Sequence, residues 1–250
     1  EGTLGIITSV TFRITPYKEH YVTTCIPIKN SSLLAPCIDI AKHHSADEIF
    51  MYDQAFMQLA DRYQPTVVPL FIDTPYVLLV THRAHDKEKL HHTIHTFRRA
   101  LPIDEYELKT LVDHETVARI SDQNFLKLLG EYYTQNVLVP NEIANGIIVT
   151  IHQLPSLLRE LESYLDQLGR LYMITGFAGS GHISVTAYFD PKSKNYANDL
   201  IGYAKEITSI VTSYNGGISA IHGEGLARAP FIQNIYSTHM LEVFRSIKKI

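Results

Sequence analysis

The stretch LYMITGFAGSGHISVTAY, residues 171–188, predicts a β-hairpin, because two strand-like runs flank a four-residue link. Leu171 to Phe177 and His182 to Tyr188 are rich in the β-branched and aromatic residues typical of strands, and the AGSG between them predicts a plain hairpin turn. The glycines of this stretch lead into a second strand and not into a helix. They therefore lack the helix N-terminus that a dinucleotide fingerprint offers to a pyrophosphate.

The segments around this hairpin predict one order of elements twice along the chain. In the second half, further strands are expected at 146–151 and 217–221, and helices at 155–168 and 195–213. In the first half, strands are expected at 20–27, 46–52, 75–82 and 103–109, helices at 30–44 and 86–100, and an inserted helix, capped by Asp53, at 53–63. Both halves follow the β-α-β-β-α-β order of the ferredoxin-like unit.

The predicted fold class is therefore α+β. Two ferredoxin-like units, about 17–110 and 146–222, are expected to form one extended antiparallel sheet with helices on one face. Helical sequence from about Glu115 to Tyr133 would bridge them.

The two ends of the chain suggest a piece of a longer protein. Ile6 to Ile14 alternate between β-branched and polar residues, which predicts a strand whose partners lie partly outside this chain. The sequence begins without an initiator methionine or a signal peptide, and it ends on an amphipathic helix without a capping glycine.

Composition excludes several classes of protein. The 250 residues are 45% hydrophobic with a net charge of -4, which is enough apolar material for a large core and too little positive charge for a nucleic-acid binder. Cys25 and Cys37 lack metal-type spacing and predict a reducing compartment. No apolar run approaches the length of a membrane span. We therefore expect a cytoplasmic protein, either free or peripheral at the inner face of a membrane.

Thirteen histidines invite metal hypotheses, which their spacing does not favour. His91 and His95 lie one helical turn apart, but no third ligand is apparent and a solvated helix face explains them better. His82, at a strand-to-helix turn, is interpreted as a cation near a helix end. Nucleophilic catalysis is not favoured, since there is no G-x-S-x-G elbow.

The run NGGISAIHGEGLARAPF, residues 215–231, combines four glycines with one histidine and one arginine. Glycine lets the backbone approach a ligand closely, which would place His222 beside it. The alternative is a strand end followed by a tight loop, with His222 a structural histidine.

Three separated stretches resemble one family. EGTLGIITSVTFRITP (1–16) resembles the last part of the FAD-binding domain in the vanillyl-alcohol oxidase superfamily. GFAGSGHIS (176–184) and GGISAIHGEG (216–225) resemble two glycine-rich segments of its FAD-linked oxidase C-terminal, or cap, domain. Their order and separation are similar to those of the D-lactate dehydrogenase and glycolate oxidase subunit branch.

The resemblance implies a division of the chain and a cofactor. Residues 1–16 would end an FAD-binding domain, 17–230 would form the substrate or cap domain, and 231–250 would be a helix leading back towards the FAD domain. His222 would accept the hydroxyl proton as hydride leaves for the flavin. The residues implied to lie along the FAD are Gly2, Thr3, Leu4, Gly5, Ile6 and Ile7.

The departures from the family pattern are equally informative. Where metal-dependent members have two histidines and a glutamate, this chain has Phe177, Ser184 and Ile221. Phenylalanine and isoleucine cannot ligate a metal and serine is a poor zinc ligand, so we predict no metal.

The predicted substrate-binding residues lie in the same two segments. His182 stands where the family often has asparagine, and Ser180 where it has aspartate. Glu224 and Arg228 would supply compensating polar groups, with a guanidinium fork suited to a carboxylate. An exposed ion pair between them is the alternative interpretation.

The resemblance therefore implies an FAD-dependent oxidoreductase that oxidises a small 2-hydroxy acid or alcohol without a metal, with the isolated chain inactive. Its implied partners are the N-terminal FAD-binding domain and, as in some relatives, an iron-sulfur electron-transfer protein. The first alternative is a catalytically degenerate cap that serves in ligand binding or assembly. The second is a stand-alone ferredoxin-like ligand-binding protein.

Overall fold

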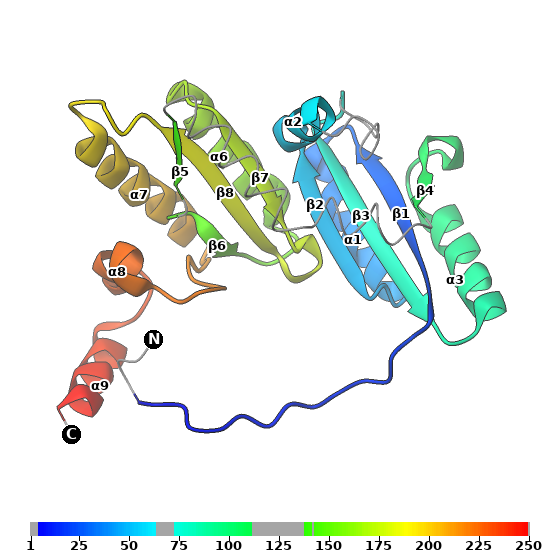
Figure 1. The fold of residues 1–250 in the computed structure, drawn as a ribbon, viewed down its shortest axis with the longest axis horizontal. Helices are drawn as coiled ribbons and strands as arrows, with labels where there is room; N and C mark the ends of the chain where they lie inside the picture. The colour runs from blue at the N-terminus through cyan, green and yellow to red at the C-terminus, as the bar shows by residue number, and fades with distance from the viewer. Residues whose placement is uncertain (1–4, 64–72, 112–137, 142, 250) are drawn as a thin grey trace.

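The structure, a computed structural model, describes residues 5–63, 73–111, 138–141 and 143–249. One antiparallel sheet of eight strands runs through both halves of the chain, in the order β4-β1-β3-β2-β7-β8-β5, with β6 also paired to β8 (Figure 1). The predicted α+β class and the single extended antiparallel sheet are confirmed.

The first half contains β1, α1, β2, β3, α3 and β4 in the predicted order, with α2 inserted after β2. The bounds are β1 His20–Ile28, η1 Ser31–Leu33, α1 Leu34–His43, β2 Glu48–Asp53, α2 Gln54–Tyr63, β3 Tyr76–Ala84, α3 Lys87–Ala100, η2 Glu105–Glu107 and β4 Lys109–Leu111.

The second half contains β6, α6, β7, β8 and α7, with the short β5 before them and a helical tail after them. The bounds are β5 Val139–Asn141, β6 Asn145–Ile148, α6 Leu154–Gln167, β7 Tyr172–Gly176, η3 Ala178–Ser180, β8 His182–Phe189, α7 Tyr196–Ser213, α8 Gly225–Arg228, η4 Ala229–Asn234 and α9 Thr238–Lys248. The hairpin link is a single 3-10 turn, closed by Gly181 in the left-handed region (φ 73°).

Helix starts follow from side chains that cap free backbone N–H groups. The Asp86 carboxylate accepts from Lys89 N at 2.9 Å, and Asp53 Oδ1 accepts from Phe56 N at 2.8 Å. Asn30 caps η1 in the same way through Ser32 N. These three starts, predicted from the sequence, are confirmed.

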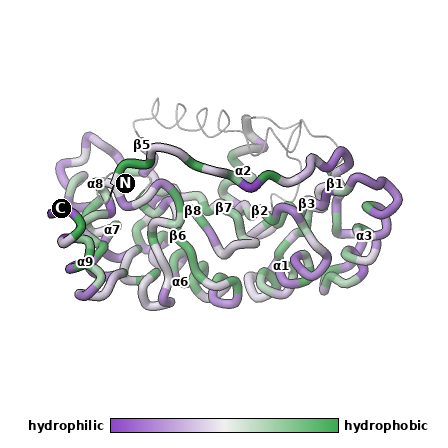
Figure 2. Tube along the Cα trace, turned by 90° about the horizontal axis from the view of Figure 1, so that it is seen from below, coloured by the Kyte–Doolittle hydropathy of each residue, from purple (hydrophilic) through white to green (hydrophobic). Residues whose placement is uncertain are grey.

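The two faces of the sheet are covered differently (Figure 2). The larger core lies between one face and α1, α3, α6 and α7, and it includes residues from both halves. A smaller cluster on the opposite face is covered by Phe56, Met57 and Leu59 of α2. The expectation of helices on one face alone is therefore wrong for α2, because its amphipathic face packs on the other side.

On β8, alternate residues face the two sides of the sheet. Ile183, Val185 and Ala187 belong to the core under the helices, whereas Tyr188 belongs to the cluster on the α2 side. His182 and Ser184 have the same parity as Tyr188, so they lie on the α2 side. We call this side of the sheet the α2 face.

The halves meet where β2 pairs with β7, through Met51–Gly176 and Tyr52–Thr175. Gly176 is required here, because a Cβ at this position would lie 2.3 Å from the carbonyl oxygen of His182.

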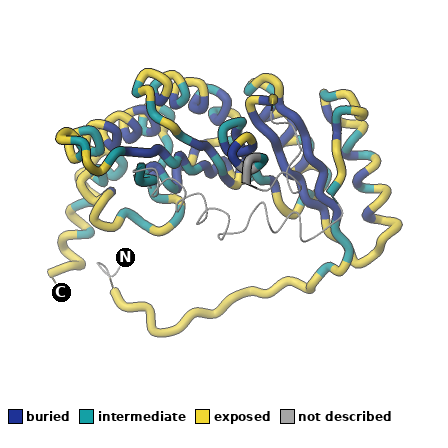
Figure 3. Tube along the Cα trace, turned by 45° about the horizontal axis from the view of Figure 1, so that its top comes forward, coloured by how far each residue is buried: buried dark blue, intermediate teal, exposed yellow. Residues whose placement is uncertain are grey.

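Three other expectations are corrected or lie outside the description. Residues 5–19 contain no strand, and Ile6, Phe12 and Ile14 are at least 80% exposed (Figure 3). The described part of the chain supplies no partner strand, so the alternation alone cannot form a sheet. The strand expected at 217–221 is reduced to one bridge between Ile148 and Gly217, and that at 103–109 to a 3-10 turn followed by β4. The helical bridge at 115–133 lies outside the described residues.

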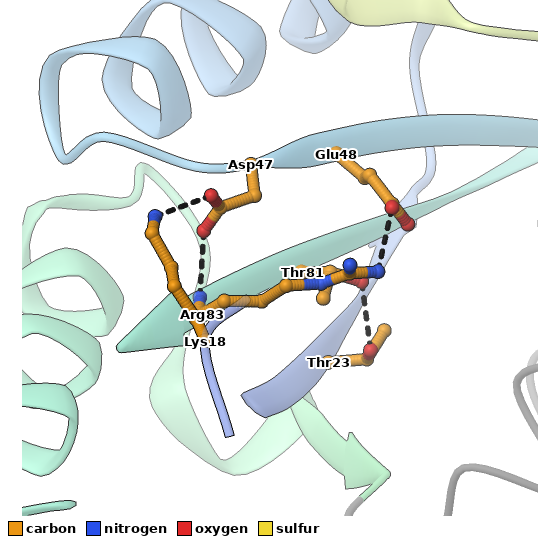
Figure 4. Close-up of polar contacts among 6 residues, drawn as sticks. All are labelled: Lys18, Thr23, Asp47, Glu48, Thr81 and Arg83. Carbon is orange, nitrogen blue, oxygen red and sulfur yellow. Dashed lines mark hydrogen bonds and ion pairs between the residues drawn. The ribbon is translucent and has the colours of Figure 1, made fainter. Parts of the chain in front are cut away.

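Asp47 fixes the point where the amino-terminal segment enters the first half (Figure 4). Its two carboxylate oxygens contact Lys18 Nζ at 2.5 Å and accept from Arg83 N at 2.7 Å. Arg83 also pairs with Glu48 at 2.6 Å, and Thr23 and Thr81 share a hydrogen bond of 2.8 Å on the adjacent strands.

Within the described ranges, no helix has both the length and the apolar character that crossing a membrane requires.

Candidate functional site

The first residue of β8, His182, lies on the α2 face beside the hairpin turn. Its side chain is buried, with 5% of the residue exposed, and Nε2 has no hydrogen-bond partner among the described residues. The ring of Phe177 stacks parallel to it, 6.0 Å between centroids and 14° between planes. Burial, and to a smaller extent the nearby His222, lower the pKa of His182. A neutral imidazole whose Nε2 is buried therefore lies on the α2 face.

His222 is presented by the loop that follows Gly217. It is one of three described non-glycine residues with positive φ, at 61°, and Gly223 continues in the same region at 64°. This conformation is costly for a residue with a Cβ, and strain of this kind is frequent at functional sites. His222 is exposed and lies on a cavity of about 340 Å³ that is lined by Asn141, Ile143, Asn145, His222, Gly223, Glu224, Gly225, Leu226, Ala227 and Arg228.

Arg228 lines the same cavity, and its guanidinium is bound by two backbone carbonyl oxygens. Its Nη1 donates to the carbonyl oxygens of Asn145 at 2.5 Å and Ile218 at 2.6 Å, and only 7% of the residue is exposed. The interpretation of Arg228 as half of an exposed ion pair is therefore wrong. Its guanidinium fastens the loop to β6 while lending positive charge to the cavity.

Glu224 is fixed by neighbours from its own segment. Its Oε1 accepts from Ser219 Oγ at 2.8 Å and from Tyr236 OH at 3.4 Å. These bonds hold the carboxylate at the cavity wall. The structure thus brings His222, Glu224 and Arg228 together on one cavity, with His182 near His222.

The three positions where the resemblance places metal ligands make other contacts. Phe177 is 53% exposed and meets Phe50 edge to face, with 4.8 Å between centroids. Ser184 Oγ donates to Asn145 Oδ1, and Ile221 lies against Gly146. In the portions of the chain described, no three His, Cys, Asp or Glu side chains gather as a metal site.

The predicted flavin-side residues are only partly described. Gly2, Thr3 and Leu4 lie outside the described residues, and Gly5, Ile6 and Ile7 are exposed. Their backbone groups make no hydrogen bond to another described residue. An extended segment with free backbone groups fits a stretch that lies against another surface or a cofactor, and these six assignments stay predictions.

Two asparagines that line the cavity were not singled out from the sequence. Asn141 Oδ1 accepts from Ile143 N at 2.9 Å, and the side chain of Asn145 is held by Ser184. A polar residue at a strand edge has no distinctive local pattern, so only the pairing of β6 with β8 shows that Asn145 and Ser184 meet.

Comparison with known proteins identifies relatives of this arrangement. A family model described as "FAD linked oxidases, C-terminal domain" matches residues 34–250. A D-2-hydroxyglutarate dehydrogenase of Stutzerimonas stutzeri (strain A1501) is 21% identical over 262 residues, which cover 100% of this chain and 54% of the relative. A probable mitochondrial D-2-hydroxyglutarate dehydrogenase of Oryza sativa subsp. indica is 24% identical and is covered over 44% of its length. The chain thus spans about half the length of these curated relatives.

Solved structures share the fold at low sequence identity. The 4-ethylphenol oxidase of Gulosibacter chungangensis, in complex with isoeugenol, superposes with a TM-score of 0.64 at 10% identity, covering 94% of this chain and 52% of that one. An alkyldihydroxyacetonephosphate synthase gives a TM-score of 0.62 at 14% identity, covering 99% of this chain and 46% of that one.

Proposed function

Because the chain belongs to the family of FAD-linked oxidase C-terminal domains, we propose that its α2 face and the His222 loop form the substrate side of a flavin-dependent oxidoreductase. The observation that carries the proposal is His222 itself, strained at φ 61° on a cavity that also contains Glu224 and Arg228. The FAD would be bound mainly by an FAD-binding domain of the same protein, together with residues 2–7. When bound, FAD supplies the acceptor for a hydride.

The chain's own residues would prepare the substrate for oxidation. The His222 imidazole takes the proton of the substrate hydroxyl while the adjacent C–H bond gives up its hydride, and the C–O bond becomes a carbonyl. Arg228 provides positive charge for a carboxylate. His182 stays a predicted substrate-binding residue: it does not line this cavity, and its buried Nε2 would reach a substrate only after a rearrangement of the side chains around it.

The proposed substrate is a small 2-hydroxy acid or a related alcohol. Two relatives are named for D-2-hydroxyglutarate, and the cavity of about 340 Å³ suits a small molecule. We propose that no metal takes part, since Phe177 and Ile221 offer no lone pair and Ser184 is already bound to Asn145.

The test is anaerobic reduction of the flavin in the full-length protein by D-lactate and D-2-hydroxyglutarate. His222→Ala should slow reduction by roughly 10²- to 10⁴-fold, the usual contribution of a general base. His95→Ala, on the exposed face of α3, is the matched control and should change little. Equal rates for wild type and His222→Ala would show that His222 is not the base.

A second candidate function is a cap that has lost catalysis and serves in ligand binding or assembly. It is favoured by the apolar side chains at two of the three metal-ligand positions. It predicts a full-length protein that carries flavin but is reduced by no hydroxy acid of the panel, although such acids perturb its visible spectrum.

A further inference from the structure

The side-chain amide of Asn145 has a fixed orientation at the cavity. Ser184 Oγ donates to Oδ1, so Nδ2 and its two N–H groups are turned away from Ser184. No other described residue binds Nδ2. Asn145 is half-buried and lines the same cavity as His222.

The backbone of Asn145 is held as firmly as its side chain. Its carbonyl oxygen accepts from Arg228 Nη1 at 2.5 Å, and the next residue, Gly146, accepts from Ala220 N at 2.8 Å. Gly146 has a φ of 99°, which favours glycine. The His222 loop and β6 are thus joined at Asn145, and the guanidinium of Arg228 contacts the backbone of Asn145.

Amide N–H groups that are fixed in position, near a positive charge and facing a small cavity, are suited to a carboxylate oxygen. A neutral donor can orient such a group without a metal ion. The partner that holds the donor, Ser184, occupies one of the positions where the resemblance places a metal ligand.

We propose that Asn145 Nδ2 donates to the carboxylate of the substrate and positions it for proton transfer to His222, with Ser184 as the residue that orients the amide. The inference rests on the proposed function. It adds that the Asn145 amide orients the substrate, the role that the metal ion has in metal-dependent members of the family. It specifies a small substrate with a carboxylate next to the reacting carbon.

The experiment uses the full-length flavoprotein and two readouts. The first is the KM and kcat for D-lactate and D-2-hydroxyglutarate. The second is the Kd of the unreactive products pyruvate and 2-oxoglutarate, measured by titrating the visible spectrum of the oxidised flavin. Asn145→Asp replaces the donor by a charged acceptor, and Asn141→Asp is its matched control, because it adds the same charge to the same cavity and retains the acceptor for Ile143 N.

Asn145→Asp should raise KM and the product Kd by about 10- to 100-fold, with kcat changed by less than about 3-fold, the pattern of lost binding to a charged group. Ser184→Ala, a milder variant if Asn145→Asp folds poorly, should raise both by about 3- to 10-fold because the amide is no longer oriented. Asn141→Asp should raise both by a smaller factor than Asn145→Asp, because it adds the same charge to the cavity but removes no proposed donor.

Unchanged KM and Kd in both Asn145→Asp and Ser184→Ala would overturn the inference, and so would equal effects of Asn145→Asp and Asn141→Asp. If the variants give either result while the flavin of the wild type is reduced by a hydroxy acid, only the role of Asn145 is wrong. The proposed function then stands. A wild type reduced by neither hydroxy acid would overturn the proposed oxidation itself, and the inference with it.

Discussion

At the scale of single residues, burial decides what each histidine can do. His82 was expected to be a cation near a helix end, but it is 1% exposed and lies against Phe97, with 4.7 Å between ring centroids. Neither ring nitrogen has a hydrogen-bond partner in the part of the chain that the structure describes, and burial lowers the pKa of His82 to about 4. His82 is therefore neutral in the folded chain at neutral pH, and the expectation is wrong.

His82 predicts a loss of stability in mild acid. Its folded pKa of about 4 lies below the unfolded value, so protons bind preferentially to the unfolded chain. The contribution is complete above about pH 6.5 and is lost as the pH falls towards 4, up to about 3 kcal/mol of unfolding free energy. Urea unfolding of wild type and His82→Leu between pH 7 and pH 4.5 measures it.

The variant should show a flatter pH dependence than the wild type, because the titrating group is gone. His95→Leu, at an exposed position of α3, should retain the wild-type dependence. If His82→Leu keeps the full slope, the acid sensitivity has another source.

Local sequence indicated which residues gather at the cavity better than how they are held there. The glycines around His222 indicated close backbone approach, and the loop does lie at a cavity. The positive φ of His222 and the burial of Arg228 could not be predicted from local sequence. Arg228 is held by the carbonyl oxygens of Asn145, 83 residues away on β6, and of Ile218, 10 residues away. Asn145 was missed for the same reason, since its partner Ser184 is 39 residues distant.

At the scale of elements, the seam between β2 and β7 joins the two halves with few backbone pairs. Asp53 reinforces it, because Oδ1 caps α2 at Phe56 N and Oδ2 accepts from Ile174 N of β7 at 2.7 Å. Burial raises the pKa of Asp53 to about 7, against the opposing effect of these two N–H groups. The helix cap was predicted from the sequence, whereas the bond across the seam was not.

Asp53→Asn tests the seam. Asparagine has a single acceptor oxygen, so capping α2 leaves its NH₂ group opposite Ile174 N–H. We expect a loss of about 1–3 kcal/mol in unfolding free energy at pH 8, where the wild-type carboxylate is ionised. Asp86→Asn, the same change at the cap of α3, should cost less than about 0.5 kcal/mol, since asparagine caps as well as aspartate. A similar small effect at both sites would contradict the role given to Oδ2.

The sequence predicted strands in places where the described part of the structure has no partner strand for them. Ile6 to Ile14 alternate as a strand does, yet this stretch is exposed and pairs with no strand of the described chain. Self-contained signals fared better: helix caps and the hairpin carry their own hydrogen-bond partners within a few residues.

At the scale of the whole molecule, one core crosses the boundary between the two halves. The larger cluster contains Ile26 and Leu78 of the first half together with Leu158 and Val185 of the second. The hydroxyl of Tyr76 on β3 donates to Glu162 on α6, and Lys42 Nζ donates to Gly179 O at 3.2 Å. Repetition of one element order thus gives two halves that share one apolar core.

A shared core predicts that the halves unfold together. Leu158→Ala removes a fully buried side chain from α6 and should cost about 2–5 kcal/mol. Hydrogen exchange measured by mass spectrometry should then show faster opening in peptides of β1 and β3 as well as β7 and β8, because the cavity weakens one cooperative unit. Leu171→Ala, at a position that is 40% exposed, is the matched control and should leave exchange nearly unchanged. Faster exchange confined to α6, β7 and β8 would mean that the second half opens alone, and that the β2–β7 seam and its side-chain bonds hold together two separately stable units.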